Sequence, residues 1–262
     1  MITASDLSVS LSGKPILHGV SLKARAGELT AIVGPNGSGK TTTMKAIAGE
    51  VASRGTITLN GHDVRALEPW QLAAKRAVLQ QATTIAFPFT VREIVRMGLS
   101  VGQNRHAERI DAVTAEALVA VDLADFAGRF YQELSGGEQQ RVQLARVLSQ
   151  IWEPVLDDEP CFLLLDEPVS SLDIRHQLII MQLARRYCEN GGGVIAVMHD
   201  LNLTAMFADH MIMMKEGRVA EAGHPSSVMT DEAMEAVFGC RMRINTTPPP
   251  GTPFVLPQTA LA

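Results

Sequence analysis

The sequence contains few cysteines and no excess of positive charge, and each shortage argues against a class of protein. The cysteines number three, and an odd, widely spaced set favours neither a disulfide framework nor a CxxC metal site. They are typical of reduced thiols in a cytosolic protein: Cys161, Cys188 and Cys240. The formal net charge is −5, with 23 Lys and Arg against 28 Asp and Glu. A phosphate-backbone binder concentrates positive charge, so we expect no nucleic acid partner.

Long apolar runs are also missing. The longest, Cys161 to Leu165 and Val194 to Met198, are far shorter than the ~20 residues of a membrane helix. The first 13 residues include Asp6 and alternate apolar with polar residues, so we expect no signal peptide. Membrane contact is therefore expected only through another protein.

The order of the elements predicts a parallel α/β core. Short β-rich runs dominate the first sixty residues, and the period becomes helical between Thr90 and Gln150. Strand patterns then return on either side of a helical pattern over Ile174 to Cys188, which indicates a βαβ unit. We expect strands at Leu7–Leu11, Val20–Ala24, Leu29–Val33, Thr56–Leu59, Cys161–Leu165 and Val194–Met198. We expect further helices at Lys40–Ala48, Ala107–Val121 and Glu138–Leu148. From Pro248 onward the chain is proline-rich and is predicted to be irregular.

A glycine-rich loop follows the strand predicted at Leu29–Val33. It fits G-x-x-x-x-G-K-[ST] between a strand and a helix, the context that supports a P-loop. Backbone N–H groups in such a loop surround phosphates, aided by the helix N-terminus. We expect Lys40 to reach the β- and γ-phosphates and Thr41 to hold Mg²⁺. The predicted nucleotide-binding residues here are Gly34, Pro35, Asn36, Gly37, Ser38, Gly39, Lys40, Thr41 and Thr42.

Two carboxylates end the apolar run Phe162 to Leu165. Asp166 suits the metal side of a Walker B motif, and Glu167 is placed to polarise an attacking water as a general base. An acidic pair after a strand is more often a helix cap or a solvated turn. With a P-loop in the same chain, the catalytic interpretation is favoured.

The segment Leu134 to Gln140 reads LSGGEQQ. Ser135 and Glu138 form a capping-box pattern before a predicted helix, but a cap does not explain Gly136, Gly137 and two glutamines. A Gly-Gly step at a helix N-terminus is a second anion site. Two phosphate sites in one chain indicate a site shared between two chains.

With these motifs the chain resembles the ABC transporter ATPases, from about Leu7 to Gly223. The resemblance implies a P-loop NTPase (RecA-like) core, an N-terminal antiparallel β subdomain and an inserted α-helical subdomain. It divides a single domain, 1–262, into a nucleotide-binding core (1–83 and 157–240), a helical subdomain (about 84–156) and a tail (241–262). It also implies a homodimer in which the signature motif at Ser135 to Gly137 closes over ATP held by the partner's P-loop, consistent with a two-fold axis.

Three further residues take roles from the resemblance alone. Asp173, in Ser170-Ser171-Leu172-Asp173, matches the D-loop of the family. His199, after the strand predicted at Val194–Met198, matches the switch histidine that contacts the γ-phosphate. Gln81 matches the Q-loop glutamine that touches Mg²⁺ or the attacking water, with Gln80 as the alternative. One position departs from the family: Leu11 stands where an aromatic residue usually stacks on adenine.

Within the family, Gln81 to Leu99 is similar to the importers of haem, iron-siderophores and cobalamin. The acidic stretch Ile151 to Cys161 and the end reaching Gln258 are most like the haemin-importer ATPases, although the stretch also suits a tolerated surface loop. The resemblance implies that the chain binds two transmembrane permease subunits and, only indirectly, a periplasmic substrate-binding protein. It also implies that the chain is a peripheral protein on the cytoplasmic face of the bacterial inner membrane. Met211, Met213 and Met214 are interpreted as core residues, so no haem ligand is assigned.

Three alternatives stay open from the sequence. A soluble ABC ATPase of a scaffold, as in iron–sulfur cluster assembly, would carry the same motifs. A DNA-repair ATPase would also carry them, but sustained heptads are absent. A module that binds nucleotide without turnover is the third.

Overall fold

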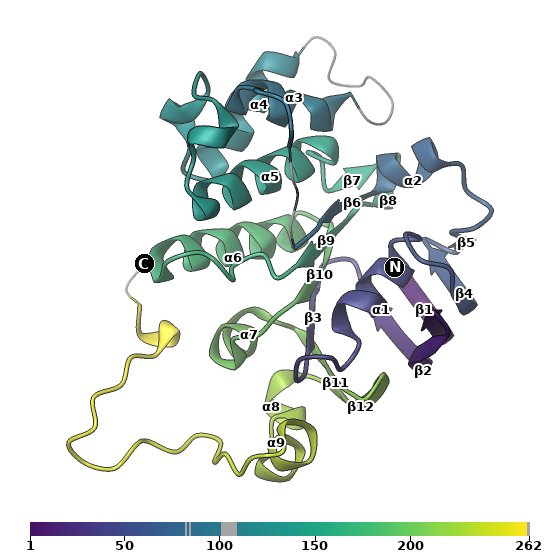
Figure 1. Cartoon of the computed structure of the whole chain (residues 1–262), viewed down its shortest axis with the longest axis vertical. Coiled ribbons are helices and arrows are strands. Elements are labelled where there is room, and N and C mark those ends of the chain that lie inside the picture. The colour runs from purple at the N-terminus through teal and green to yellow at the C-terminus, as the bar shows by residue number, and fades with distance from the viewer. Residues whose placement is uncertain (82, 84, 101–108, 261–262) are drawn as a thin grey trace.

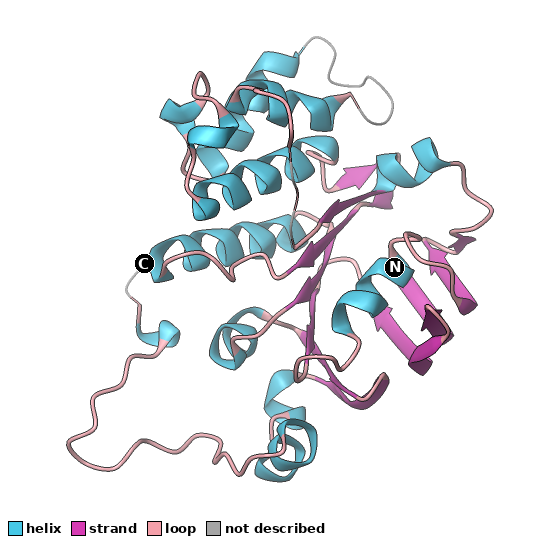
Figure 2. Cartoon of the chain, viewed as in Figure 1, coloured by secondary structure: helices cyan, strands magenta, loops and turns pink. Residues whose placement is uncertain are grey.

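The computed structural model describes residues 1–81, 83, 85–100 and 109–260, which form a central sheet, a second sheet and layers of helices (Figure 1). The antiparallel sheet lies on one side of the central sheet, and a cluster of helices lies beyond one end of the central sheet (Figure 2). Over this described part of the chain, no helix combines the length and apolar character needed to cross a membrane.

The N-terminal sheet is antiparallel, as predicted. Its order is β2-β1-β4-β5, with bounds β1 (Ile2–Leu11), β2 (Lys14–Ala24), β4 (Arg54–Leu59) and β5 (His62–Asp63). Ser12 and Gly13 connect β1 to β2 with positive φ values of 49° and 78°, and two left-handed residues match the twist of a two-residue hairpin. The strands extend further toward the N-terminus than expected because their polar residues lie on the exposed face.

The central sheet has the order β12-β11-β3-β10-β9-β6. Its strands are β3 (Leu29–Val33), β6 (Arg76–Leu79), β9 (Phe162–Asp166), β10 (Gly193–Val197), β11 (His210–Lys215) and β12 (Arg218–Gly223). All neighbours are parallel except β12, which pairs antiparallel with β11. Every residue of β3, β9 and β10 is buried, which is why these strands read as continuous apolar runs.

Alternate residues of the central strands enter two different cores. On β3, Ile32 packs into the core shared with the antiparallel sheet, whereas Ala31 and Val33 face the opposite core. This is the period of two that a strand imposes. Met211 and Met213 lie in the second core and Met214 in the first, all fully buried, so their interpretation as core residues is confirmed.

Helices cover both faces of the central sheet (Figure 1). Met44 and Ile47 of α1 pack into the core shared with the antiparallel sheet, whereas Ile180 and Leu203 pack into the other core. The helices outside the inserted layer are α1 (Lys40–Ile47), α2 (Pro69–Lys75), α6 (Ile174–Glu189), α7 (Leu201–Phe207), α8 (Pro225–Val228) and α9 (Asp231–Phe238). The sequence analysis predicted α1 and α6 and missed the other four, which are short.

The inserted helical layer is α3 (Val91–Leu99), α4 (Ile110–Ala120) and α5 (Gly136–Gln150), with short 3-10 turns at Ala124–Phe126 and Tyr131–Glu133. These helices confirm the predicted helical insertion. A further 3-10 turn, Pro257–Thr259, lies in the tail. The helix predicted from Ala107 begins at Ile110, and residues 101–108 lie outside the described residues, as do 82 and 84. With the two sheets, this layer confirms the predicted fold class.

Gly98 marks the closest approach of α3 to α5. A Cβ at this position would lie 2.0 Å from the carbonyl oxygen of Arg146 and 2.4 Å from Oγ of Ser149. Gly98→Ala should therefore lower the free energy of unfolding by about 1–3 kcal/mol, measured by denaturant titration. Gly128→Ala is the matched control, since a Cβ there would meet no described atom within 4 Å. Equal unfolding midpoints for the two variants would contradict this packing.

The acidic stretch before β9 is a small hairpin, β7 (Val155–Leu156) and β8 (Glu159–Pro160). Asp157 and Asp158 form its turn with φ values of 51° and 62°, and Glu159 forms an ion pair with Lys75 of α2. The described part of the proline-rich tail is irregular apart from its 3-10 turn, as predicted.

Candidate functional site

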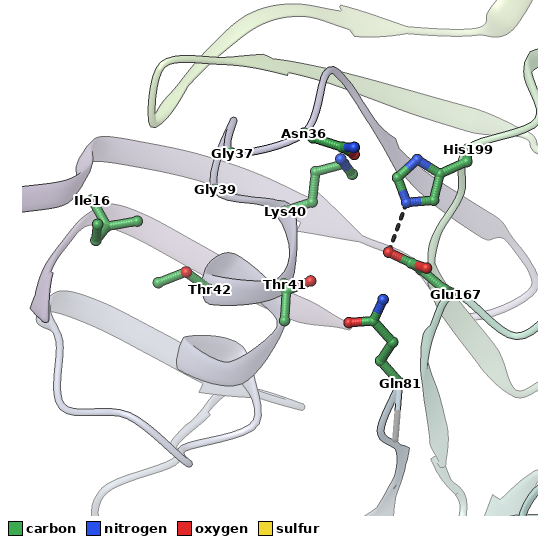
Figure 3. Close-up of a pocket in the computed structure, with 10 residues that line it drawn as sticks. All are labelled: Ile16, Asn36, Gly37, Gly39, Lys40, Thr41, Thr42, Gln81, Glu167 and His199. Carbon is green, nitrogen blue, oxygen red and sulfur yellow. Dashed lines mark hydrogen bonds and ion pairs between the residues drawn. The ribbon is translucent and has the colours of Figure 1, made fainter. Parts of the chain in front are cut away.

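The predicted catalytic motifs meet at one edge of the central sheet. The P-loop follows β3, Glu167 follows β9 and His199 lies two residues beyond β10, and these three strands are neighbours in the sheet. The carboxyl ends of parallel strands are where open α/β sheets bind ligands. A cavity of about 600 Å³ lies there (Figure 3), lined by Ile16, Asn36, Gly37, Gly39, Lys40, Thr41, Thr42, Gln81, Glu167 and His199.

The P-loop turns tightly enough to require glycine. Gly34, Gly37 and Gly39 have φ values of 148°, 78° and 101°, a region that favours glycine. A Cβ at Gly34 would lie 2.2 Å from the carbonyl oxygen of Met214, so strand β11 leaves no room for a side chain. Gly39 is also the N-cap of α1, so the loop leads directly into the helix N-terminus, where backbone donors favour an anion.

Lys40 points from α1 back across the loop. Its Nζ donates hydrogen bonds to the carbonyl oxygens of Gly34, at 2.9 Å, and Pro35, at 3.1 Å. Burial lowers the pKa of Lys40, and the nearby carboxylates of Glu167 and Asp166 oppose that shift. The ammonium group is thus a partly desolvated cation, which attracts an anion more strongly than an exposed lysine does. Pro35 and the buried Ser38 support the loop from outside the cavity lining.

Thr41 lines the cavity, and Asp166, which does not, forms an oxygen-rich pair with it. Thr41 Oγ1 donates to Asp166 Oδ1 at 3.2 Å. Burial raises the pKa of Asp166, while the hydrogen bond from Thr41 lowers it and Glu167 raises it further. Among the described residues no group of three or more His, Cys, Asp or Glu side chains could hold a metal ion. Hydroxyl, carboxylate and amide oxygens still suit a hard cation such as Mg²⁺, which commonly takes one or two carboxylates together with substrate phosphates.

Glu167 and His199 contact each other in the cavity wall (Figure 3), with His199 Nε2 2.6 Å from Glu167 Oε1. The Glu167 side chain is 14% exposed and that of His199 is 42% exposed. Glu167 also has a positive φ of 53°, a left-handed backbone that costs a non-glycine residue about 1–3 kcal/mol. Such strain concentrates at functional sites, where the surrounding structure fixes the direction of a side chain.

The structure separates Gln81 from Gln80. Gln81 lines the cavity and points toward Thr41 and Glu167 (Figure 3). Gln80 instead donates from Nε2 to Glu50 Oε2 at 3.2 Å, outside the lining. The geometry therefore favours Gln81 for the Q-loop role.

The cavity wall contains a residue that the sequence analysis missed. Ile16, on β2, lines the cavity, whereas Leu11 at the end of β1 is 43% exposed and does not. Among the described residues, the lining includes no aromatic side chain. The strand pattern of β2 made Ile16 visible as apolar, but only the sheet pairing brings it beside the P-loop.

Four predicted nucleotide contacts lie outside this cavity. Ser135 is the N-cap of α5 and accepts from Glu138 N, while Glu138 accepts from Ser135 N at 2.7 Å, so the capping box is present. Gly136 follows it and is exposed. Gly137 packs against the loop after β9, where a Cβ would lie 3.0 Å from the carbonyl oxygen of Ser171. Asp173 is the N-cap of α6 and pairs with His176 at 2.8 Å. One chain alone does not bring these four residues to Lys40.

Known proteins match the whole chain. The sequence is 66% identical over 262 residues to the hemin import ATP-binding protein HmuV of Rhizobium johnstonii, covering 100% of this chain and 99% of that protein. It is 58% identical to the protein of the same name from Mesorhizobium japonicum, covering 100% of both. A solved ATP binding subunit of an ABC transporter superposes with a TM-score of 0.77 at 23% identity, covering 92% of this chain and 94% of the other, which supports the fold.

The family model described as ABC transporter matches residues 17–170, more than half of the chain, and that range includes the P-loop, the signature segment and Glu167. Together with the full-length identity to curated relatives, this match shows that the chain belongs to the ABC transporter family.

Proposed function

We propose that this chain binds MgATP and hydrolyses it as the ATPase subunit of an importer whose cargo is haemin. The observation that carries the proposal is a single cavity lined by Lys40, Thr41, Glu167 and His199, with Asp166 hydrogen-bonded to Thr41 beside it. A phosphate-binding loop, a metal-binding pair and a general base are the parts that phosphoryl transfer to water requires.

Each side chain has a distinct task in this proposal. Lys40 and the loop N–H groups bind the β- and γ-phosphates, and Glu167 accepts the proton of the attacking water. His199 holds the Glu167 carboxylate at 2.6 Å and would contact the γ-phosphate, as the family resemblance implies. Thr41, Asp166 and Gln81 would hold Mg²⁺, which neutralises phosphate charge when it is bound.

Two chains are proposed to complete each site. Ser135, Gly136, Gly137 and Asp173 lie away from Lys40 in the same chain, which supports their use at the partner's nucleotide. A two-fold pair then contains two equivalent composite sites. In this proposal the closed pair binds ATP more tightly than the open form, so binding and hydrolysis shift the population between closed and open forms. Each chain would consist of a nucleotide-binding core (1–83 and 157–240), a helical subdomain (about 84–156) and a tail (241–262).

The proposed cargo comes from the names of the relatives, and the proposed partners come from the family resemblance. Curated proteins named as hemin import subunits share 58% and 66% of this sequence over its whole length, which supports haemin as the cargo. In this proposal the chain lies on the cytoplasmic face of the inner membrane and binds two transmembrane permease subunits. The permease in turn receives cargo from a periplasmic substrate-binding protein. Iron-siderophore or cobalamin import is the alternative cargo assignment, and a scaffold ATPase is the alternative class.

Two measurements test the proposal. The purified chain should release phosphate from MgATP and form an ATP-dependent dimer. The chain co-expressed with its permease should support ATP-driven uptake of haemin into vesicles, with a ferric siderophore and cobalamin as competing cargoes. Uptake of either competitor in place of haemin would overturn the cargo, and failure to associate with any permease would favour the scaffold alternative. ATP binding without phosphate release would leave only the binding-module interpretation.

A further inference from the structure

The side chain of Gln140 connects the signature helix to the catalytic glutamate. Gln140 is the fifth residue of α5, the helix that begins with Gly136 and Gly137. Its Nε2 donates to the carbonyl oxygen of Glu167 at 2.8 Å, and its Oε1 accepts from Ser171 Oγ. The Glu167 carbonyl can only accept, so the amide nitrogen must face it, and the Ser171 hydroxyl then donates to the amide oxygen. Both the nitrogen and the oxygen of the Gln140 amide therefore form hydrogen bonds with the loop after β9.

The group that Gln140 holds is the strained backbone of Glu167. The carbonyl of Glu167 also accepts from the N–H of Ser170 at 3.4 Å and from its Oγ at 3.2 Å. Both contacts are long, and both come from the same loop, so they move with it. Gln140 supplies the shortest hydrogen bond to this carbonyl, and it does so from another layer of the structure. The backbone of Glu167 is left-handed, with φ at 53°, and this hydrogen bond helps to fix the backbone from which the carboxylate that contacts His199 extends.

Gln140 joins the start of α5 to Glu167, and in the proposed dimer these two segments act at different nucleotides. Glu167 lines its own chain's cavity, whereas Gly136 and Gly137 lie outside that cavity at the start of α5. Gly137 approaches Ser171 so closely that a Cβ would lie 3.0 Å from its carbonyl oxygen. The start of α5 and the loop after Glu167 are therefore packed together, and a displacement of one displaces the other.

We propose that Gln140 is a positioning residue that sets the backbone of Glu167 from the signature helix, so that closure of this helix on the partner's nucleotide places the general base at the chain's own nucleotide. The inference rests on the proposed function, because it requires ATP hydrolysis at two shared sites. It goes beyond that function by naming the contact that joins the two sites within one chain.

Gln140→Ala tests the proposal in the homodimer. We expect kcat for ATP hydrolysis to fall by about tenfold to 100-fold, with KM for ATP changed less than about twofold, because a misplaced base slows chemistry without weakening the P-loop contacts. Gln140→Glu keeps the size of the side chain and an acceptor for Ser171 but removes the donor, so it should not restore kcat. It also serves if the alanine variant folds poorly.

Gln150→Ala is the matched control. Gln150 lies at the other end of α5 and donates to the carbonyl oxygens of Ala73, at 2.8 Å, and Arg76, at 3.0 Å, in the same kind of contact. Its loss should lower the unfolding midpoint as much as the loss of Gln140 does and leave kcat within about twofold. If Gln150→Ala and Gln140→Ala lower kcat equally, or if Gln140→Glu keeps the wild-type kcat, the proposal is overturned.

Mixed dimers separate the two directions of coupling. Glu167→Gln in one chain stops hydrolysis at that chain's own site but leaves its ATP bound, so the remaining turnover uses Glu167 of the other chain. Gln140→Ala placed in that other chain should then abolish most of the remaining turnover, whereas the same substitution in the Glu167→Gln chain should have little effect. The reverse pattern would mean that Gln140 acts through the signature segment and would overturn the role assigned here. Failure of the wild-type chain to hydrolyse ATP would instead refute the proposed function.

Discussion

Replacing Glu167 with glutamine should lower the rate of phosphate release by more than about 100-fold, because an amide cannot accept the proton of the attacking water. The substitution keeps the size of the side chain and an oxygen that can face His199, which lies 2.6 Å from Glu167 Oε1. ATP binding depends on Lys40 and the P-loop, so it should persist. The variant should therefore accumulate as an ATP-bound dimer, measured by size-exclusion chromatography in MgATP alongside phosphate release.

Glu216→Gln provides the control for this substitution. Glu216 is an exposed glutamate between β11 and β12 that also has a positive φ, 48°, but it lies outside the cavity lining. The Glu216→Gln variant should hydrolyse ATP at the wild-type rate. Full activity in Glu167→Gln, or dimerisation that ignores ATP, would show that another group activates the water and would favour the scaffold or binding-module alternatives.

Lys40→Ala should weaken ATP binding by at least about 100-fold and reduce turnover below detection. Lys40 is the charged group that the loop directs toward the cavity, and it is only 6% exposed. Removing it deletes the cation that faces the phosphates and leaves the carboxylate of Glu167 on the same cavity to repel them. At an ATP concentration 100 times the dissociation constant, binding raises the free energy of unfolding of the wild-type chain by about 2.7 kcal/mol. The variant should show no ATP-induced rise in unfolding temperature.

Lys45→Ala is the matched control for this experiment. Lys45 lies in the last turn of the same helix, α1, is exposed and is absent from the cavity lining. The Lys45→Ala variant should keep an ATP-induced rise in unfolding temperature close to that of the wild type. Without nucleotide, Lys40→Ala should unfold near the wild-type temperature, because Lys40 donates only to two backbone carbonyls and its removal relieves a desolvated charge. A normal ATP shift in Lys40→Ala would contradict the assigned phosphate contact.

Local sequence was sufficient for the parts of the site built from consecutive residues. The P-loop, the Asp166–Glu167 pair and the Ser135 cap each combine a strand or helix boundary with the residues beside it, and the structure places them at those boundaries. The central strands β3, β9 and β10 were equally predictable, since burial on both faces produces an unbroken apolar run. Strand β6 and helix α2 were missed because each is short and contains polar residues.

The sequence by itself determined the parallel α/β core, the helical insertion, the phosphate-binding loop and the acidic pair, because these follow from periodicity and from neighbours along the chain. Only the tertiary structure decided that Ile16 and not Leu11 lines the cavity, that Gln81 and not Gln80 faces Thr41, and that Gln140 reaches the carbonyl of Glu167. These are contacts between elements far apart in the chain. Their partners are chosen by strand register and helix packing, which no local pattern encodes.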